Sequence, residues 1–332
     1  MSDYNLENLQ ALIKKATELH VERNFTEAID YYKGAMKLGL SIYDESKNER
    51  EKKELSTLIL KLSKNLDKCK GPNFDDVVGL EDFKKLFREN IFAVVRNRKM
   101  AEKYKVKANC CILLQGPPGT GKSYGIKAAV NEFPEAQLFE TKVSDLIDAY
   151  IGNTGKNIDK LFNKAKEYIN EREDHYAIIF IDEIDGIARS RKSDDKGAKE
   201  AMSSLLVNLT KVDEENLNII FIGATNTPDE LDAAFLSRFG NNIVEIPLPD
   251  TEARKMILKK NLPYASEDIN WDKISLLTFG LNGRDLKFIA KDANKKAFNN
   301  AIEGEEGPVD EKVLEDMIKI AIDRRKKIAN HL

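Results

Sequence analysis

A glycine-rich run constrains this chain more than any other part of its sequence. Residues 116–123 read GPPGTGKS, which fits the pattern GxxxxGK[ST]. The run follows the apolar residues CCILLQ and precedes a stretch with helical spacing, so the expected order is strand, loop and helix. In that order the backbone N–H groups of the loop and the N-terminus of the helix surround a phosphate group. The sequence therefore predicts an α/β domain that binds a nucleotide.

Two side chains of the run have expected chemical roles. The ammonium of Lys122 can reach the β- and γ-phosphates, and the hydroxyl of Ser123 can ligate Mg²⁺. The whole loop and the residue after it form the predicted cofactor-binding set: Gly116, Pro117, Pro118, Gly119, Thr120, Gly121, Lys122, Ser123 and Tyr124.

Polar residues at two further expected strand ends complete this constellation. Asp182 follows the apolar run IIFI and would hold Mg²⁺ through water, while the adjacent Glu183 could deprotonate the attacking water. Asn226 ends the next apolar run and could polarise the same water, because parallel strands end at one crevice. A helix cap at Asp182 and Glu183, and a turn residue before Pro228 at Asn226, are the ordinary alternatives. Together with the phosphate loop, the acidic pair indicates hydrolysis as well as binding.

The hydrophobic pattern divides the chain into three parts. Residues 1–70 carry apolar positions at helical spacing in three stretches, which predicts a small antiparallel bundle. Residues 71–248 begin with the break Gly-Pro-Asn and then alternate apolar runs with helical stretches, which predicts a largely parallel sheet between helices. Residues 249–332 return to helices and are expected to form a C-terminal lid. The runs expected to be strands are 110–115, 137–141, 177–182, 218–224 and 243–246.

Composition narrows the class of protein further. The chain has 53 basic and 56 acidic side chains and a formal net charge of −3, whereas nucleic-acid binders are normally basic. No window approaches the roughly 20 apolar residues of a membrane span, and the start MSDYNLENLQ lacks a signal-peptide pattern. The three cysteines form no CxxC motif. We therefore expect a cytoplasmic protein with no nucleic-acid partner.

Four motifs in the same order resemble the AAA family of ATPases. They are GPPGTGKS, IIFIDEID, GATN and LDAAFLSRF, and the resemblance covers about residues 72–325. It implies an AAA+ core with a five-stranded parallel sheet, with ATP and Mg²⁺ as cofactors. By the same resemblance Asp182, Glu183 and Lys122 act in hydrolysis, Asn226 is the first sensor residue, and Arg238 is the arginine finger that reaches the neighbouring subunit's γ-phosphate.

The resemblance also places the adenine pocket and shows two departures. The segment FDDVVGL implies that the backbone around Asp76 and Gly79 packs on adenine, and the stretch GLNGRD is similar to a Ser-Gly-Ala-Asp stretch that lines the same pocket. Only Gly283 of that stretch is assigned to the pocket, because Asn282 and Arg284 replace the usual small residues. Ser237 stands where family members usually carry the first of two arginines, which leaves Arg238 as one finger.

Two other segments resemble parts of the ATPase that disassembles ESCRT-III filaments, in the meiotic clade of the family. ERNFTEAIDYY within residues 1–70 is similar to an MIT domain, a three-helix module that binds ESCRT-III-like tails; a single tetratricopeptide unit is the alternative. Tyr150 and Ile151 resemble a pore loop that grips a polypeptide in an ATP-bound hexamer. The short connection before the last helix and the end of the chain at Leu332 favour an archaeal-type protein.

The resemblance implies an ATP-driven protein remodeller that acts on ESCRT-III-like filaments in membrane scission or cell division. Its contact with membranes would be indirect, by peripheral recruitment to filaments. Two alternatives stay open at this point. One is a severing ATPase similar to katanin and spastin, which a long basic linker would favour. The other is a binding scaffold that switches with nucleotide and hydrolyses it slowly.

Overall fold

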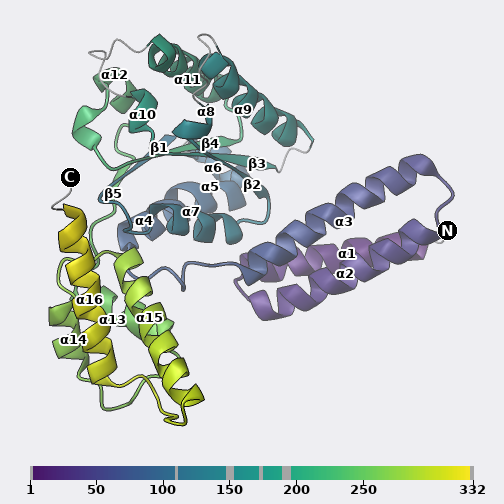
Figure 1. Ribbon diagram of the computed structural model, residues 1–332. Helices are drawn as coiled ribbons and strands as arrows, with labels where there is room; N and C mark the ends of the chain where they lie inside the picture. Colours follow the sequence, from purple (N-terminus) through teal and green to yellow (C-terminus); the bar gives the residue numbers. More distant parts are fainter. Residues whose placement is uncertain (1–2, 109–110, 147–152, 172–174, 189–195, 330–332) are drawn as a thin grey trace.

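The structure is a computed structural model that describes residues 3–108, 111–146, 153–171, 175–188 and 196–329. Figure 1 shows three parts: a helical bundle at the N-terminus, a sheet covered by helices on both faces, and a group of helices at the C-terminus. Among the helices in these ranges, none combines the length and the apolar character needed to cross a bilayer.

The N-terminal bundle consists of the three helices that the periodicity predicts. They are α1 (Asp3–Val21), α2 (Phe25–Glu45) and α3 (Glu49–Lys70). The side-chain amide oxygen of Asn48 caps α3 by accepting hydrogen bonds from the N–H groups of Arg50 and Glu51. Ala16, Tyr32 and Leu62 are buried between the helices, so each helix turns its apolar stripe inward. The arrangement is consistent with a three-helix bundle.

The central sheet has five parallel strands, which confirms the predicted fold class. Its order is β2-β3-β4-β1-β5, and each neighbouring pair runs parallel. The strands are β1 (Cys111–Gln115), β2 (Ala136–Lys142), β3 (Tyr176–Asp182), β4 (Ile219–Thr225) and β5 (Ile243–Glu245). Their bounds follow the predicted runs closely.

Alternating side chains give the sheet two apolar faces. Ile178 and Phe180 of β3 join one cluster with helix α7, whereas Ile179 and Ile181 join the cluster on the opposite face with α9 and α11. Because both faces are covered, these strands read as continuous apolar runs.

The helices of this part are α4 (Glu81–Leu86), a π-helical turn (Phe87–Phe92), α5 (Ala93–Arg96), α6 (Arg98–Tyr104), α7 (Lys122–Asn131), α8 (Val143–Leu146), α9 (Asn153–Asn170), α10 (Asp185–Ala188), α11 (Lys196–Glu214), a 3₁₀ turn (Pro228–Glu230) and α12 (Ala233–Leu236).

The C-terminal helices form a lid with a core of its own. They are α13 (Thr251–Asn261), α14 (Trp271–Leu277), α15 (Gly283–Ile302) and α16 (Glu311–Ala329). Leu258, Ile274 and Leu286 are buried together between them. Asn282 and Asp285 form a capping box that fixes where α15 begins.

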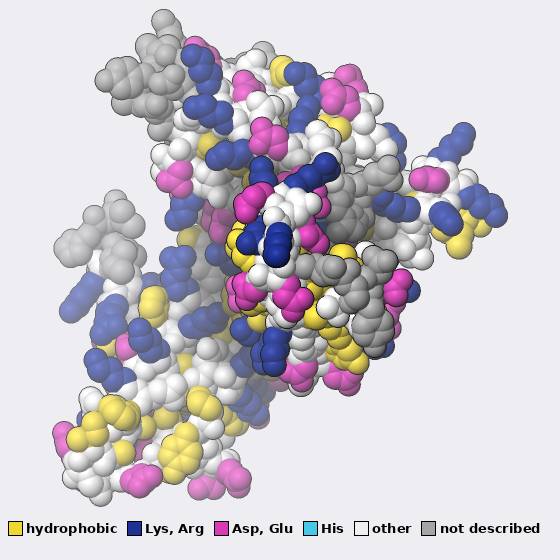
Figure 2. All heavy atoms as spheres, turned by 90° about the vertical axis from the view of Figure 1, so that its right-hand side faces the viewer, with side chains coloured by type: hydrophobic (Ala, Val, Ile, Leu, Met, Phe, Trp, Pro, Cys, Tyr) yellow, Lys and Arg dark blue, Asp and Glu magenta, His cyan; other side chains and the backbone are white. Residues whose placement is uncertain are grey.

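The bundle packs against the far end of α7, the helix that starts at the phosphate loop. Nε2 of His20 lies 2.5 Å from the carbonyl oxygen of Asn131, and the ammonium of Lys68 donates to the carbonyl oxygens of Phe133 and Pro134 at 3.1 and 3.0 Å. A positive charge on Lys68 at this end is favoured by the negative end of the α7 dipole. Figure 2 views the molecule from the bundle's side and shows basic and acidic side chains interspersed over this face.

Candidate active site

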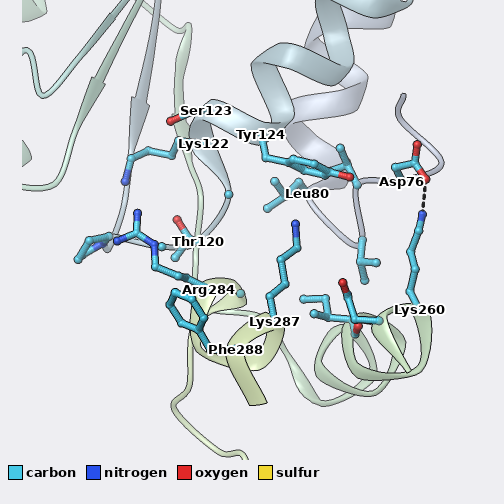
Figure 3. Close-up of a pocket in the computed structure, with 18 of the residues that line it drawn as sticks. Asp76, Leu80, Thr120, Lys122, Ser123, Tyr124, Lys260, Arg284, Lys287 and Phe288 are labelled. Carbon is cyan, nitrogen blue, oxygen red and sulfur yellow. Dashed lines mark hydrogen bonds and ion pairs between the residues drawn. The ribbon is translucent and has the colours of Figure 1, made fainter. Parts of the chain in front are cut away.

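A cavity of about 650 Å³ lies between the carboxyl edge of the sheet and the C-terminal helices. The phosphate loop, the segment after α3, the ends of β3 and β4, and one face each of α13 and α15 surround it, as the close-up in Figure 3 shows. Parallel α/β sheets bind ligands at this edge. The residues that line it are Asp76, Val77, Val78, Leu80, Pro118, Gly119, Thr120, Gly121, Lys122, Ser123, Tyr124, Asp182, Glu183, Asn226, Ile257, Lys260, Asn261, Gly283, Arg284, Lys287 and Phe288.

Two glycines of the phosphate loop occupy positions that a side chain could not. A Cβ on Gly116 would lie 2.2 Å from the carbonyl oxygen of Ile246, so this glycine lets the loop pass directly over the end of β5. Gly119 has a φ of +78°, and a Cβ there would lie 2.8 Å from the amide of Asn282. These contacts explain why the loop needs glycine at both points.

Lys122 lies at the centre of the polar groups in the cavity. Its ammonium donates to the carbonyl oxygens of Gly116 at 2.7 Å and Pro117 at 3.1 Å, and to the side-chain oxygen of Asn226 at 2.8 Å. Burial lowers the pKa of Lys122, and the carboxylates of Asp182 and Asp185 oppose that shift. The ammonium is therefore held by neutral oxygens that a phosphate group can replace.

Ser123 and Asp182 meet as the sequence predicts. The Ser123 hydroxyl donates to a carboxylate oxygen of Asp182 at 3.0 Å, which puts two oxygen ligands of the kind Mg²⁺ prefers within reach of one ion. Among the described residues no group of three or more His, Cys, Asp or Glu side chains could hold a metal ion. Mg²⁺ that is bound together with a nucleotide takes few protein ligands and keeps waters and phosphate oxygens.

Glu183 follows Asp182 in a backbone conformation that is rare for its type. Its φ is +57°, in the left-handed region, and its N–H donates to Asp182 at 3.0 Å. Strain of this kind costs on the order of 1–3 kcal/mol and concentrates at functional sites. The conformation places the Glu183 carboxylate in the cavity, where it is exposed.

Asn226 follows β4 directly and also lines the cavity. The residue before it, Thr225, is buried and donates its hydroxyl to the carboxylate of Asp185 at 3.0 Å. This bond joins the end of β4 to the first residue of α10. Thr225 belongs to the motif GATN and Asp185 to the motif IDEID, but neither residue has a role predicted from the sequence.

The segment before α4 and the lid form the other end of the cavity. Asp76 is predicted to lie there and does so, with its carboxylate 2.5 Å from the ammonium of Lys260 on α13. Tyr124 faces Leu80 in Figure 3, and the ammonium of Lys287 lies 4.1 Å from the centre of the Tyr124 ring. Gly283 lines the cavity as predicted.

Six lid residues in the cavity follow helical spacing. Ile257, Lys260 and Asn261 on α13, and Arg284, Lys287 and Phe288 on α15, each occupy positions i, i+3 and i+4 of their helix. Of these six residues only Arg284 stands out in the sequence, as a departure from the family pattern. Their helical spacing indicates that the residues share one face of each helix. That pattern alone does not indicate a binding site, because charged residues on a helix face are usually solvated.

Several predicted residues do not line this cavity. Gly79, Gly116 and Pro117 are not among its lining residues, although the carbonyl oxygens of Gly116 and Pro117 accept hydrogen bonds from Lys122. Arg238 is exposed on the turn after α12 and is not part of the lining. The predicted pore residues Tyr150 and Ile151 lie outside the described residues.

Five parallel strands in this order, with a phosphate loop between β1 and α7 and a separate helical lid, define a P-loop nucleotide-binding protein. The sequence comparison then gives the family. Residues 112–248 match the family described as ATPase family associated with various cellular activities (AAA). This segment is therefore an AAA domain, and the AAA family predicted from the motifs is confirmed for it.

Curated relatives and a solved structure agree with this assignment. The chain is 33% identical over 241 residues to Cell division protein C of Sulfolobus acidocaldarius, and 34% identical over 226 residues to Vacuolar protein sorting-associated protein 4B of Mus musculus. These matches cover 70% and 66% of this chain, and 62% and 49% of the relatives. The crystal structure of the FIGL-1 AAA domain in complex with ADP is 26% identical, with a TM-score of 0.62 over 75% of this chain and 84% of that one.

Proposed function

We propose that this chain hydrolyses ATP and uses the energy to remodel protein assemblies. One observation carries the proposal: Lys122, Ser123, Asp182, Glu183 and Asn226 all line a single cavity next to the phosphate loop. In the proposed reaction Lys122 binds the β- and γ-phosphates, and Ser123 and Asp182 hold Mg²⁺, which neutralises phosphate charge when it is bound. Glu183 removes a proton from the attacking water, and the Asn226 amide orients that water.

The proposed active form is a homo-oligomer, a hexamer when ATP is bound. Arg238 is exposed and outside its own chain's cavity, which fits a residue that acts on a neighbouring subunit. An arginine supplied in this way contributes about 10³–10⁵ to the rate of related phosphoryl transfers. Assembly would therefore switch hydrolysis on.

The proposed substrates are ESCRT-III-like proteins, whose tails bind an MIT-like bundle formed by residues 1–70. The three-helix arrangement of α1 to α3 supports this assignment, as do two relatives named for cell division and for vacuolar protein sorting. Tyr150 and Ile151 would contact the extended polypeptide in the pore. Membrane association would then be indirect, through the filament.

A substitution of Glu183 tests the hydrolytic part of the proposal. Glu183→Gln keeps the size and hydrogen bonding of the side chain but removes its basicity, so we expect ATP binding to persist while turnover falls by about 10²-fold or more. Oligomers of this variant should persist in ATP when sized by light scattering. Normal turnover by the variant would remove Glu183 from its assigned role.

A disassembly assay tests the substrate class. Tyr150→Ala should retain ATP turnover and lose the ability to disassemble ESCRT-III-like filaments, as followed by sedimentation. Tyr104→Ala is a matched control, because Tyr104 is an exposed tyrosine on α6, 66% accessible. Equal disassembly by the wild type and Tyr150→Ala would contradict the pore assignment.

A slow nucleotide-switched scaffold is the second candidate function. Ser237 directly before Arg238 favours it, since one guanidinium is available where the resemblance implies two. Turnover that stays near the uncatalysed rate in assembled oligomers, with ATP-dependent partner binding, would support the scaffold.

A further inference from the structure

The hydroxyl of Thr225 joins two segments at the edge of the nucleotide cavity. Thr225 is the last residue of β4 and is completely buried. Its hydroxyl donates to the carboxylate of Asp185 at 3.0 Å and accepts the backbone N–H of Thr227, also at 3.0 Å. A hydroxyl group has one donor and two acceptor sites, so both bonds form together. Asn226 lies between the two threonines, and the hydroxyl therefore closes a tight turn around it.

This turn determines where the Asn226 side chain starts. Asn226 itself is exposed, so packing against neighbours does not hold its amide. The amide oxygen accepts a hydrogen bond from the ammonium of Lys122 at 2.8 Å. When Lys122 binds the β- and γ-phosphates, its ammonium has to be shared with phosphate oxygens. The turn closed by Thr225 is then the support of Asn226 that does not depend on the ligand.

Asp185 anchors the turn to the segment that carries Glu183. It is the first residue of α10 and comes two residues after Glu183. Between them, the N–H of Ile184 donates to the carbonyl oxygen of Ala224 on β4 at 2.9 Å. The segment after β3 is therefore bonded twice to the end of β4, through Ile184 and through Asp185. The left-handed backbone of Glu183, with a φ of +57°, and the turn at Asn226 thus belong to one hydrogen-bonded framework.

The proposed hydrolysis requires Glu183 and Asn226 to act on the same water molecule. A general base works within about 2.6–3.2 Å of the group whose proton it removes. A displacement of about 1 Å in such a site can lower the rate by about 10²-fold. The relative position of Glu183 and Asn226 therefore matters for the chemical step, whereas phosphate binding depends on Lys122 and the phosphate loop.

We propose that Thr225 is a positioning residue for hydrolysis. Its hydroxyl, anchored to Asp185, holds Asn226 at a fixed place relative to Glu183, so that the amide orients the water from which Glu183 takes a proton. Thr225 is not among the residues that line the cavity, so it acts through Asn226. The inference rests on the proposed function, since it assumes that the cavity hydrolyses ATP.

Two substitutions of Thr225 separate the hydroxyl from the shape of the side chain. Thr225→Val keeps the branched shape and removes the hydroxyl, whereas Thr225→Ser keeps the hydroxyl. Turnover is measured at saturating ATP and Mg²⁺, and the dissociation constant of ADP is measured by calorimetry. We expect Thr225→Val to lower kcat by about 10-fold or more and to change the dissociation constant of ADP by less than about 2-fold. Thr225→Ser should keep kcat within about 3-fold of the wild type.

Thr278→Val is the matched control. Thr278 is as deeply buried as Thr225, but it lies in the lid, and its hydroxyl donates to the carbonyl oxygens of Ile274 at 3.0 Å and Ser275 at 3.1 Å. This variant should hydrolyse ATP at the wild-type rate. Circular dichroism checks that each variant folds. If Thr225→Val does not fold, Asp185→Ala takes its place, because it removes the anchor at a half-buried position and should lower kcat to the same extent.

A second background shows whether Thr225 acts through Asn226. In Asn226→Ala there is no amide left to position, so adding Thr225→Val should lower the residual kcat by less than about 2-fold. A purely structural role of Thr225 would instead give the same loss of kcat in both backgrounds.

Each other outcome overturns the inference in a recognisable way. Normal turnover by a folded Thr225→Val, or equal losses in the Val and Ser variants, would show that the hydroxyl is not what matters. Equal losses in both backgrounds, or a similar loss in Thr278→Val, would show that the substitution acts through stability. ADP binding that weakens in step with kcat would assign Thr225 to the phosphate loop. A wild type that binds ATP without hydrolysing it would remove the proposed function, whereas turnover by the wild type and Thr278→Val limits the failure to Thr225.

Discussion

Burial of His20 between the bundle and the ATPase domain makes the free energy of unfolding depend on pH. His20 is fully buried, and its Nε2 lies 2.5 Å from the carbonyl oxygen of Asn131. Because a carbonyl oxygen only accepts, Nε2 carries the proton, and Nδ1 is free to accept from the Tyr32 hydroxyl at 3.2 Å. Neutral imidazole therefore satisfies both contacts.

Burial lowers the pKa of His20 from 6.5 to about 4; the Asn131 carbonyl opposes the shift, and the charges of Lys68 and Arg96 add to it. Between these two values the unfolded chain binds more protons than the folded one, so stability rises with pH there and is lost as pH falls. From the pKa of His20 in the unfolded and the folded chain, the free energy of unfolding falls by about 2.5 kcal/mol near pH 4.5. The fall approaches a limit of about 3 kcal/mol at lower pH. Above pH 6.5 the contribution is fully present.

Urea unfolding followed by far-ultraviolet circular dichroism measures this effect. We compare the wild type with His20→Gln, whose amide N–H can still donate to Asn131 but does not titrate. The difference between the two unfolding free energies should change by about 2.5 kcal/mol between about pH 7.5 and pH 4.5, with the wild type losing more. A difference that stays constant would refute the claim that His20 is buried and neutral at the junction of the bundle with α7.

Three further predictions concern the cavity and its assembly. Gly116→Ala should abolish nucleotide binding with the circular dichroism spectrum retained, because the new Cβ meets the Ile246 carbonyl oxygen at 2.2 Å; normal binding would contradict the geometry of the loop. Asn282→Ala should destabilise the lid by about 1 kcal/mol in urea unfolding followed by Trp271 fluorescence, since it removes the cap of α15, and an unchanged midpoint would argue against the capping box. Arg238→Ala and Glu183→Gln should each be inactive alone and regain turnover when mixed, and a mixture without activity would count against action between subunits.

The fold and the phosphate site were predictable because their signals are local. A buried parallel strand is a short apolar run, and the phosphate loop is one continuous motif, so Lys122 and Ser123 could be placed from the sequence. Asp182 and Asn226 could be placed because parallel strands end at the same edge of a sheet. In the structure all four residues line one cavity.

Contacts between segments that are distant in the sequence could not be predicted, because no local pattern marks them. His20 and Asn131 are 111 residues apart, and no local sequence pattern connects them. Lys287 and Phe288 resemble ordinary surface residues of a helix until α15 is placed over the phosphate loop. Their role depends on how the lid packs, and the motifs do not encode that packing.

Steady-state ATP turnover against protein concentration tests the central claim most directly, because the proposed site needs both its own Glu183 and a neighbour's Arg238. The account predicts Mg²⁺-dependent release of phosphate whose rate per chain rises as the oligomer forms, and no comparable rise for Glu183→Gln. ATP that binds but is not hydrolysed by the wild type at any concentration, assembled or not, would contradict it.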